Sequence, residues 1–342
     1  MTFQIIIDDL FQQHIGPNLM HPECPGRVLS IVNELLKTNV FHQLQRAPLR
    51  QITREELLLV HFPKYLTKIE REFKNTFGYL DPQTYFGKKT GEVAAVAAGS
   101  IIDLTTKIYQ NNNNIKRGFA VTRPPGHHAR PNGAMGFCIY NNLALAAANL
   151  CKNGASRVAI IDIDFHHGNG IQDAFYNRSD VFYLSIHQEN TYPGTGFLHE
   201  TGEGEGKGYN LNLPLAPLAG INEFLAVIEQ IFKPALFRYQ PEIILVAAGF
   251  DAHKRDPLGN MQLTREGFQL VFAKLRQLAE ELCKGKIMGV LEGGYHLNST
   301  AVCCSDLITS WNSSPYISFK KTPTPNSSTK KIIKKARKLH KL

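Results

Sequence analysis

The sequence has little cysteine, no long apolar run and no basic-then-apolar leader at its N-terminus. Its six cysteines are spread over 342 residues and none forms a C-x-x-C pair, so a disulfide framework is not expected. No stretch of about 18 apolar residues occurs, so no transmembrane helix is predicted. Residues 1–5 lack the features of a signal peptide. These absences predict an intracellular protein, cytoplasmic or nuclear.

Acidic residues are missing from residues 319–342, which hold nine of the 38 lysines and arginines. The other 29 basic residues equal the 29 acidic ones, so the excess charge of +9 lies in this segment. The preceding residues are rich in proline and serine, a composition that favours a flexible chain. We therefore expect one folded domain over residues 1–312 and a flexible basic tail over residues 313–342.

Three interpretations of the basic tail stay open. Its charge fits a nuclear-localisation segment or a contact with nucleic acid or chromatin. Its apolar residues also fall at helical spacing, and such a basic amphipathic helix fits an anionic membrane or a partner's groove. The third interpretation is a solvated extension. The apolar residues concerned are Ile332, Ile333, Ala336, Leu339 and Leu342.

Short β-branched apolar runs alternate with longer amphipathic segments along the rest of the chain. This alternation predicts an α/β fold with three layers, in which helices cover both faces of a mostly parallel central sheet. The predicted strands are Phe3–Ile7, Gly118–Thr122, Val158–Ile163, Val181–Ile186, Ile243–Ala247 and Ile287–Leu291. The predicted helices are Gly91–Tyr109, Asn142–Asn153, Asn222–Tyr239 and Thr264–Lys284.

Ionisable residues gather just after four of these strands, where open parallel sheets bind ligands. Asp162, Asp164 and His166 alternate along an extended segment, so their side chains share one side. Such a cluster needs a cation to offset repulsion and desolvation. With Asp251, which follows another strand, Asp164 and His166 supply a three-ligand set suited to catalytic zinc. A single aspartate here would more simply be a helix cap.

Two further motifs stand at the same edge. His127-His128 follows a Pro-Pro-Gly turn, and a neutral imidazole there can accept a proton from a metal-activated water and pass it to a leaving amine. Asp162 and Asn169 are candidate partners that fix the histidine tautomers. Tyr295 follows two glycines and is placed to donate a hydrogen bond to a developing oxyanion. By itself, Gly-Gly-Tyr is weak evidence.

Five linked motifs resemble the histone deacetylase superfamily, in the same order along most of the chain. The likeness starts at His21-Pro22-Glu23 with Arg27 and ends at Glu292–Tyr295. It implies the arginase/deacetylase variant of the α/β fold. It also implies a zinc-dependent hydrolase that removes acetyl groups from acetyl-lysine in histones or other proteins. The other motifs are Arg123–His128 with Gly136-Phe137-Cys138, Asp162–Gly170, and Gly249–Asp251 with Asp256–Gly259.

The resemblance also implies a role for each matched position. Asp164, His166 and Asp251 would bind one Zn²⁺ per chain. His128 would be the principal base and acid, His127 its electrostatic support, and Tyr295 the oxyanion donor. The acyl-lysine tunnel would be lined by Gly136, Phe137 and Tyr192. A structural K⁺ would be held by Asp162, Asp164, His166 and Ser185, and Asp81 would grip the substrate backbone.

Asn169 and the Asp256–Gly259 motif are similar to class II members and their bacterial relatives. Leu258 stands where polyamine-selective relatives tend to carry glutamate, which argues against an acetylpolyamine substrate. Two alternatives nevertheless stay open, namely deacetylation of a small amide and a non-catalytic acetyl-lysine or chromatin binding module. The oligomeric state and physiological substrate do not follow from the sequence.

Overall fold

The computed structural model describes residues 2–18, 20–313 and 324–342, and its centre is a parallel eight-stranded sheet. The strand order is β2-β1-β5-β10-β9-β6-β7-β8, and a separate antiparallel pair joins β3 to β4. The ten strands are β1 (Thr2–Ile7), β2 (Gln45–Arg46), β3 (Phe77–Tyr79), β4 (Tyr85–Gly87), β5 (Ile115–Val121), β6 (Val158–Asp162), β7 (Val181–Gln188), β8 (Asn210–Leu215), β9 (Ile243–Ala248) and β10 (Ile287–Leu291).

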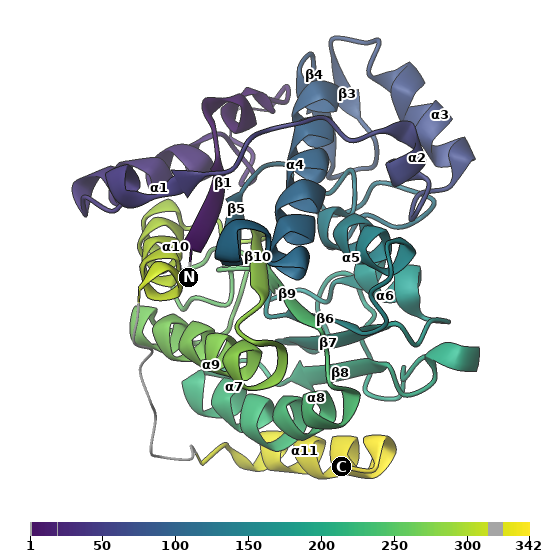
Figure 1. Cartoon of the computed structure of the whole chain (residues 1–342), viewed down its shortest axis with the longest axis vertical. Coiled ribbons are helices and arrows are strands. Elements are labelled where there is room, and N and C mark those ends of the chain that lie inside the picture. The colour runs from purple at the N-terminus through teal and green to yellow at the C-terminus, as the bar shows by residue number, and fades with distance from the viewer. Residues whose placement is uncertain (1, 19, 314–323) are drawn as a thin grey trace.

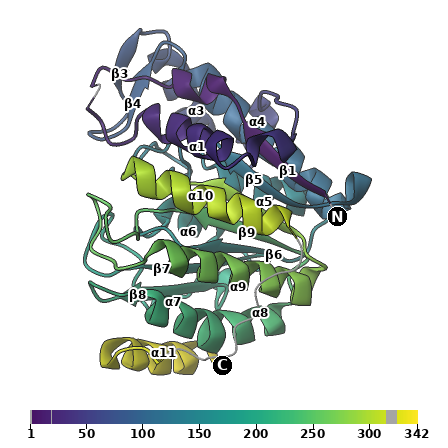
Figure 2. The same cartoon turned by 90° about the vertical axis from the view of Figure 1, so that its left-hand side faces the viewer.

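Helices cover both faces of the sheet, as Figures 1 and 2 show. On one face α1, α10 and α9 pack side by side, continued by α7 and α8; α4, α5 and α6 cover the other face. The three-layer α/β/α architecture predicted from the sequence is confirmed. The helices are α1 (Gly26–Lys37), α2 (Arg54–Leu57), α3 (Pro63–Glu72), α4 (Thr90–Gln110), α5 (Asn142–Lys152), α6 (Asn169–Phe175), α7 (Ile221–Val227), α8 (Lys233–Tyr239), α9 (Arg265–Cys283), α10 (Leu297–Asn312) and α11 (Ser327–His340).

Shorter helical segments complete the chain. A π-helical turn, η5 (Ile228–Phe232), joins α7 to α8 without a break, so the helix expected over Asn222–Tyr239 is present and contains one π turn at its middle. The 3-10 turns are η1 (Asp9–Gln13), η2 (Phe41–Gln43), η3 (Asn112–Asn114) and η4 (Gly204–Gly206). In the part of the chain that the structure describes, no helix is long and apolar enough to cross a membrane.

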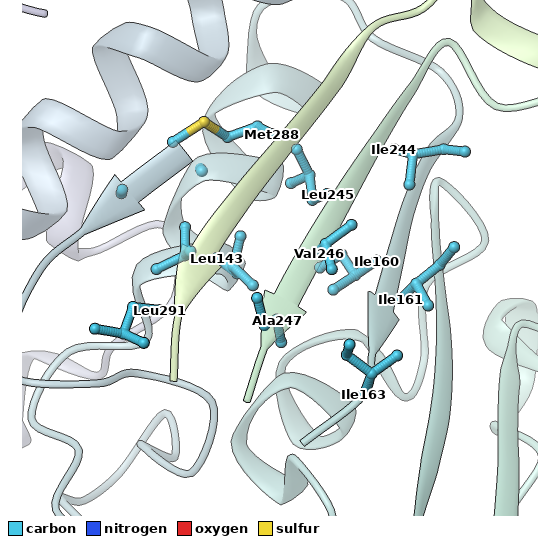
Figure 3. Packing of buried hydrophobic residues seen from close by; sticks show 14 of the residues in the cluster. Leu143, Ile160, Ile161, Ile163, Ile244, Leu245, Val246, Ala247, Met288 and Leu291 are labelled. Carbon is cyan, nitrogen blue, oxygen red and sulfur yellow. The ribbon is translucent and has the colours of Figure 1, made fainter. Parts of the chain in front are cut away.

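The central strands are apolar because helices cover both of their faces. Every residue of β6, β9 and β10 is buried, as expected for a parallel sheet. Figure 3 shows Ile160 and Ile161 of β6, Val246 of β9 and Leu291 of β10 within this core, with Leu143 from α5. This packed core fixes the position at which each strand ends, and it therefore also fixes the positions of the residues that directly follow the strands.

The expected flexible tail differs from the structure over α11. Thr329, Ile333, Ala336 and His340 share one side of this helix and are buried, and α11 packs against β8 and η5 along one end of the molecule (Figures 1 and 2). The helical spacing of the apolar residues noted in the sequence, Ile333 and Ala336 among them, is enough to dock this helix despite its lysine-rich composition. Residues 314–323, also in the expected tail, lie outside the described residues. The division of the chain at residue 312 stays a prediction.

Candidate active site

Four neighbouring strands deliver the predicted chemical groups to one edge of the sheet. β5, β10, β9 and β6 are adjacent in the sheet order, and each is followed by one of the motifs singled out above. Parallel strands end on the same side, so the motifs meet although they lie far apart in the sequence.

Asp164, His166 and Asp251 form a compact group able to hold a metal ion. One donor atom from each lies within 4.8 Å of the other two. His166 Nδ1 is 3.2 Å from Asp164 Oδ1 and 3.0 Å from Asp251 Oδ2. Both carboxylates are fully buried. One imidazole nitrogen and two carboxylates are a usual donor set for catalytic zinc, and three protein ligands leave a position open for water or substrate.

The electrostatics of this group show why it suits a cation. Burial and the neighbouring Asp164 carboxylate raise the pKa of Asp251 to about 7. Burial opposes the charge of His166, yet the two carboxylates raise its pKa to about 9. Without a metal, the two buried carboxylates can lower their mutual repulsion only by sharing protons with the His166 imidazole. A divalent cation bound among them removes that repulsion.

Two glycines shape the backbone around these carboxylates. A Cβ atom at Gly249 would lie 2.1 Å from Asp164 Oδ2, and one at Gly293 would lie 2.3 Å from Asp251 Oδ2. Gly293 N–H also donates a hydrogen bond of 2.8 Å to Asp164 Oδ2. No larger residue fits this cradle, so the metal fits the residues present both in donor type and in space.

The tandem histidines lie beside the cluster with different partners. His127 Nδ1 is 3.2 Å from Asp162 Oδ2, whereas His128 Nδ1 is 2.8 Å from Asn169 Oδ1. Both rings are buried, 4.0 Å apart between centroids. Burial disfavours a charged His127, but Asp164 and Asp162 overcome this and raise its pKa to about 10. Burial and the charge of His127 lower the pKa of His128 well below its ordinary value.

These partners assign distinct states to the two rings. The amide oxygen of Asn169 accepts, so Nδ1 of His128 carries the proton and its Nε2 is free to accept another. Asp162, also held by Tyr183 Oη at 3.0 Å, favours a protonated His127. Behind them, Glu292 Oε2 accepts hydrogen bonds from the backbone N–H groups of Gly126 (2.7 Å) and His127 (3.1 Å). The turn that carries both rings is thus fixed to the Glu292–Tyr295 loop.

A cavity of about 250 Å³ opens onto this chemistry. Gly136 and Phe137 form part of its wall, and both have positive φ angles, +54° and +70°. A Cβ at Gly136 would lie 2.5 Å from His128 Cδ2, so the wall approaches the ring closely. The phenylalanine conformation is strained, as is common where function dictates geometry. The lining residues are Pro22, Gln83, His128, Gly136, Phe137, His166, Thr191, Tyr192, Leu258 and Tyr295.

Two predicted positions lie differently from the rest. Asp81 is not among the lining residues; its Oδ1 accepts hydrogen bonds from the backbone N–H groups of Gln83 (2.8 Å) and Thr84 (2.6 Å) and so shapes the β3–β4 loop. Gln83 lines the cavity instead. Ser185 pairs with Asp162 across β7 and β6, and its Oγ lies 2.8 Å from His187 Nδ1. Ser185 is buried and is not among the residues that line the cavity.

Supporting residues were missed by the sequence analysis. Asp256 Oδ2 accepts hydrogen bonds from the backbone N–H groups of Tyr295 (2.7 Å) and His296 (3.1 Å). Arg27 donates to the carbonyl oxygens of Gly294 (2.8 Å) and Glu292. Both residues stand in recognised motifs, but a motif does not show which backbone atoms a side chain reaches. The cavity residues Gln83 and Thr191 left no sequence signal.

Known proteins resemble this chain over most of its length. The sequence model of the family described as the histone deacetylase domain matches residues 21–311 of this chain. Histone deacetylase 10, chloroplastic, of Oryza sativa is 36% identical over 94% of this chain and 78% of its own. A probable deacetylase of Archaeoglobus fulgidus is 36% identical over 80% of this chain and 76% of its own.

Two further matches are a relative with a different named substrate and a solved structure. The human polyamine deacetylase HDAC10 is 36% identical over 82% of this chain and 44% of its own. A crystal structure of the HDA15 HD domain superposes with a TM-score of 0.92 at 32% identity, covering 99% of this chain and 94% of the other. The chain belongs to the histone deacetylase family, whose members are deacetylase-type hydrolases.

Proposed function

We propose that the chain is a zinc-dependent lysine deacetylase that hydrolyses acetyl-lysine in histones or other proteins. The observation that carries the proposal is the meeting, at the end of one cavity, of the Asp164–His166–Asp251 group with His128 and Tyr295. These supply a metal site, a base and an oxyanion donor, as amide hydrolysis requires.

Each side chain has a defined task in this scheme. Zinc, held by Asp164, His166 and Asp251, would polarise the acetyl carbonyl and acidify the attacking water. His128 accepts a proton from that water at Nε2 and returns it to the departing lysine amine. His127 stays protonated beside Asp162 and stabilises negative charge. Tyr295, whose pKa is raised well above its ordinary value by burial, stays protonated and donates to the oxyanion.

The cavity favours acetyl-lysine over an acetylpolyamine. A polyamine carries several positive charges and needs acidic groups near the mouth, but no carboxylate lines the cavity in the part of the chain that the structure describes. Leu258, 41% exposed, presents an apolar surface there. Phe137 and Tyr192 fit the aliphatic stem of a lysine. One relative is a polyamine deacetylase, which makes acetylspermidine the necessary comparison substrate.

A structural K⁺ beside the zinc is the second part of the proposal. Asp162 and Ser185 are paired in register across β6 and β7 and are both buried, and Asp162 precedes Asp164 by two residues. Their oxygens suit a hard monovalent cation. We expect K⁺ to raise the melting temperature more than equal Li⁺, and Ser185→Ala to reduce the difference. Equal stabilisation by both ions would count against this site.

The deciding experiment is hydrolysis of a fluorogenic acetyl-lysine peptide and of acetylspermidine, before and after a chelator and after zinc is returned. We expect peptide turnover that disappears with chelation, returns with zinc, and falls about 10²–10³-fold in Tyr295→Phe. Faster turnover of acetylspermidine would reassign the substrate class. Tight peptide binding without turnover, in zinc-loaded protein, would indicate a binding module instead.

A further inference from the structure

Helix α11 presents a one-sided cationic face to solvent. Its buried side consists of Thr329, Ile333, Ala336 and His340. At 100° per residue, four lysines and Ser327 lie opposite that side. These four lysines, Lys331, Lys334, Lys335 and Lys338, are exposed and are called the lysine face below.

Further cations flank the lysine face. Lys330 and Arg337 are exposed on the same helix, and Lys341 is exposed just after it. Arg238 of α8 and Lys207 lie near its C-terminal end, since both act on the buried ring of His340. Residues 324–342 contain no aspartate or glutamate. Among the described residues, no aspartate or glutamate forms an ion pair with a basic side chain of α11; Arg337 Nε donates to the main-chain oxygen of Leu342 at 3.3 Å. The face is therefore unneutralised.

This charge pattern works against the helix that carries it. Lys331 and Lys335 are four residues apart, as are Lys334 and Lys338, and like charges at this spacing destabilise a helix. Tertiary contacts hold the helix instead: Arg238 donates to the carbonyl oxygen of His340 at 2.8 Å, and Glu223 accepts from Asn326 N–H at 3.0 Å. Docking onto β8 and η5 accounts for the buried side but not for the lysine face.

We propose that the lysine face binds the phosphodiester backbone of nucleic acid, without sequence preference. A duplex carries one negative charge per about 1.7 Å of its axis, and a helix of 14 residues spans about 21 Å at 1.5 Å per residue. A rigid row of cations on that scale faces several phosphates at once. The inference goes beyond the proposed deacetylase activity and does not depend on it.

The docking of α11 argues against a membrane as the partner. Basic amphipathic helices bind membranes by burying their apolar side among the lipids. Here that side is already buried against the protein, and Leu339, 48% exposed, is the large apolar side chain left on the outer part of the helix. Charge alone remains for binding, which favours the partner of highest charge density.

The test is the affinity for a fluorescent DNA duplex of random sequence, measured by anisotropy between about 50 and 200 mM NaCl. The test variant combines Lys331→Gln, Lys334→Gln, Lys335→Gln and Lys338→Gln. The matched control removes the same charge from exposed lysines elsewhere, by Lys64→Gln, Lys68→Gln, Lys74→Gln and Lys88→Gln. Circular dichroism and peptide deacetylation verify that both variants fold.

We expect the wild type and the control to bind alike, and the α11 variant to bind at least about tenfold more weakly at the higher salt. The slope of log K against log salt should fall by about 0.9 for each lysine that contacts a phosphate. Equal weakening in both variants would show a general charge effect and overturn the proposal. Absence of DNA binding by the wild type would also overturn it. A third contrary result would be binding to anionic but not neutral lipid vesicles that is lost in the α11 variant, together with DNA binding that this variant keeps.

Discussion

Asp256 holds the backbone of Tyr295 rather than its side chain. The Oδ2 atom accepts the N–H of Tyr295 at 2.7 Å and that of His296 at 3.1 Å, while Oδ1 accepts the N–H of Leu258 at 3.0 Å. One buried carboxylate thus joins the loop after β9 to the loop after β10. Two residues that line the cavity depend on it for their position.

We predict that Asp256→Asn lowers kcat about 10- to 100-fold with little change in KM. Hydrogen bonds to a charged group contribute about 1.5–3 kcal/mol, and their loss would free the Tyr295 phenol from the position it needs in the transition state. Asp306→Asn, which removes a partly buried carboxylate paired with Arg265 far from the cavity lining, is the control and should behave as the wild type.

A double-mutant cycle tests whether Asp256 acts through Tyr295. In a Tyr295→Phe background, Asp256→Asn should cost little further activity, because the group that it positions is already gone. If the two losses multiply, Asp256 has another role, and its assignment as a positioning residue is wrong.

We predict that Gly293→Ala abolishes zinc binding. The added methyl group would lie 2.3 Å from Asp251 Oδ2 and 2.6 Å from Asp164 Oδ2, so at least one carboxylate has to move. Gly133→Ala is a matched control, since no atom lies within 4 Å of the added Cβ there. Metal content after zinc loading should be about one ion per chain in the control and near zero in Gly293→Ala. Full zinc occupancy in both variants would place the metal elsewhere.

We predict that Leu258→Glu changes the substrate preference toward acetylpolyamines. A carboxylate at the cavity mouth would attract the second amine of the substrate, and the ratio of kcat/KM for acetylspermidine to that for an acetyl-lysine peptide should rise at least about tenfold, equal to about 1.4 kcal/mol. Leu258→Gln has the same size without the charge and should leave the ratio nearly unchanged. A similar change in both variants would indicate a steric rather than an electrostatic cause.

We predict that mild acid loosens α11. Burial, with the nearby charges of Arg238 and Lys207, lowers the pKa of His340 to about 4, although the backbone of Gly208 opposes this; an unfolded histidine has a pKa of about 6.5. The unfolded helix therefore binds the proton first. The docking energy is fully present above about pH 6.5 and declines as the pH falls toward 4.

Hydrogen exchange of the α11 amides, corrected for intrinsic rates, measures this loosening. Protection should decline between pH 7 and 5 in the wild type and in His199→Gln, which alters an exposed histidine. In His340→Gln the decline should be absent. An unchanged pH dependence in that variant would mean that another group controls the docking.

Local pattern was sufficient for the central strands and for the chemistry at their ends. Val158–Asp162 and Ile243–Ala248 are apolar throughout because both of their faces are covered, and this shows in the sequence. The edge strand β8 was missed, since its asparagines and proline interrupt the apolar residues Leu211, Leu213 and Leu215. Likewise, α1 and α10 pack mainly against other helices, and their patterns were not recognised.

The sequence by itself determined the order of the layers and the set of groups that meet, because strand polarity brings every carboxyl end to one edge. Tertiary structure decided which atoms those groups reach. It turned Asp81 toward its own loop, placed Gln83 at the cavity, aimed Asp256 at the backbone of Tyr295, and docked α11 onto β8. Each of these contacts depends on how closely two segments approach that are far apart in the chain. The residue types and spacing within one segment do not determine that distance.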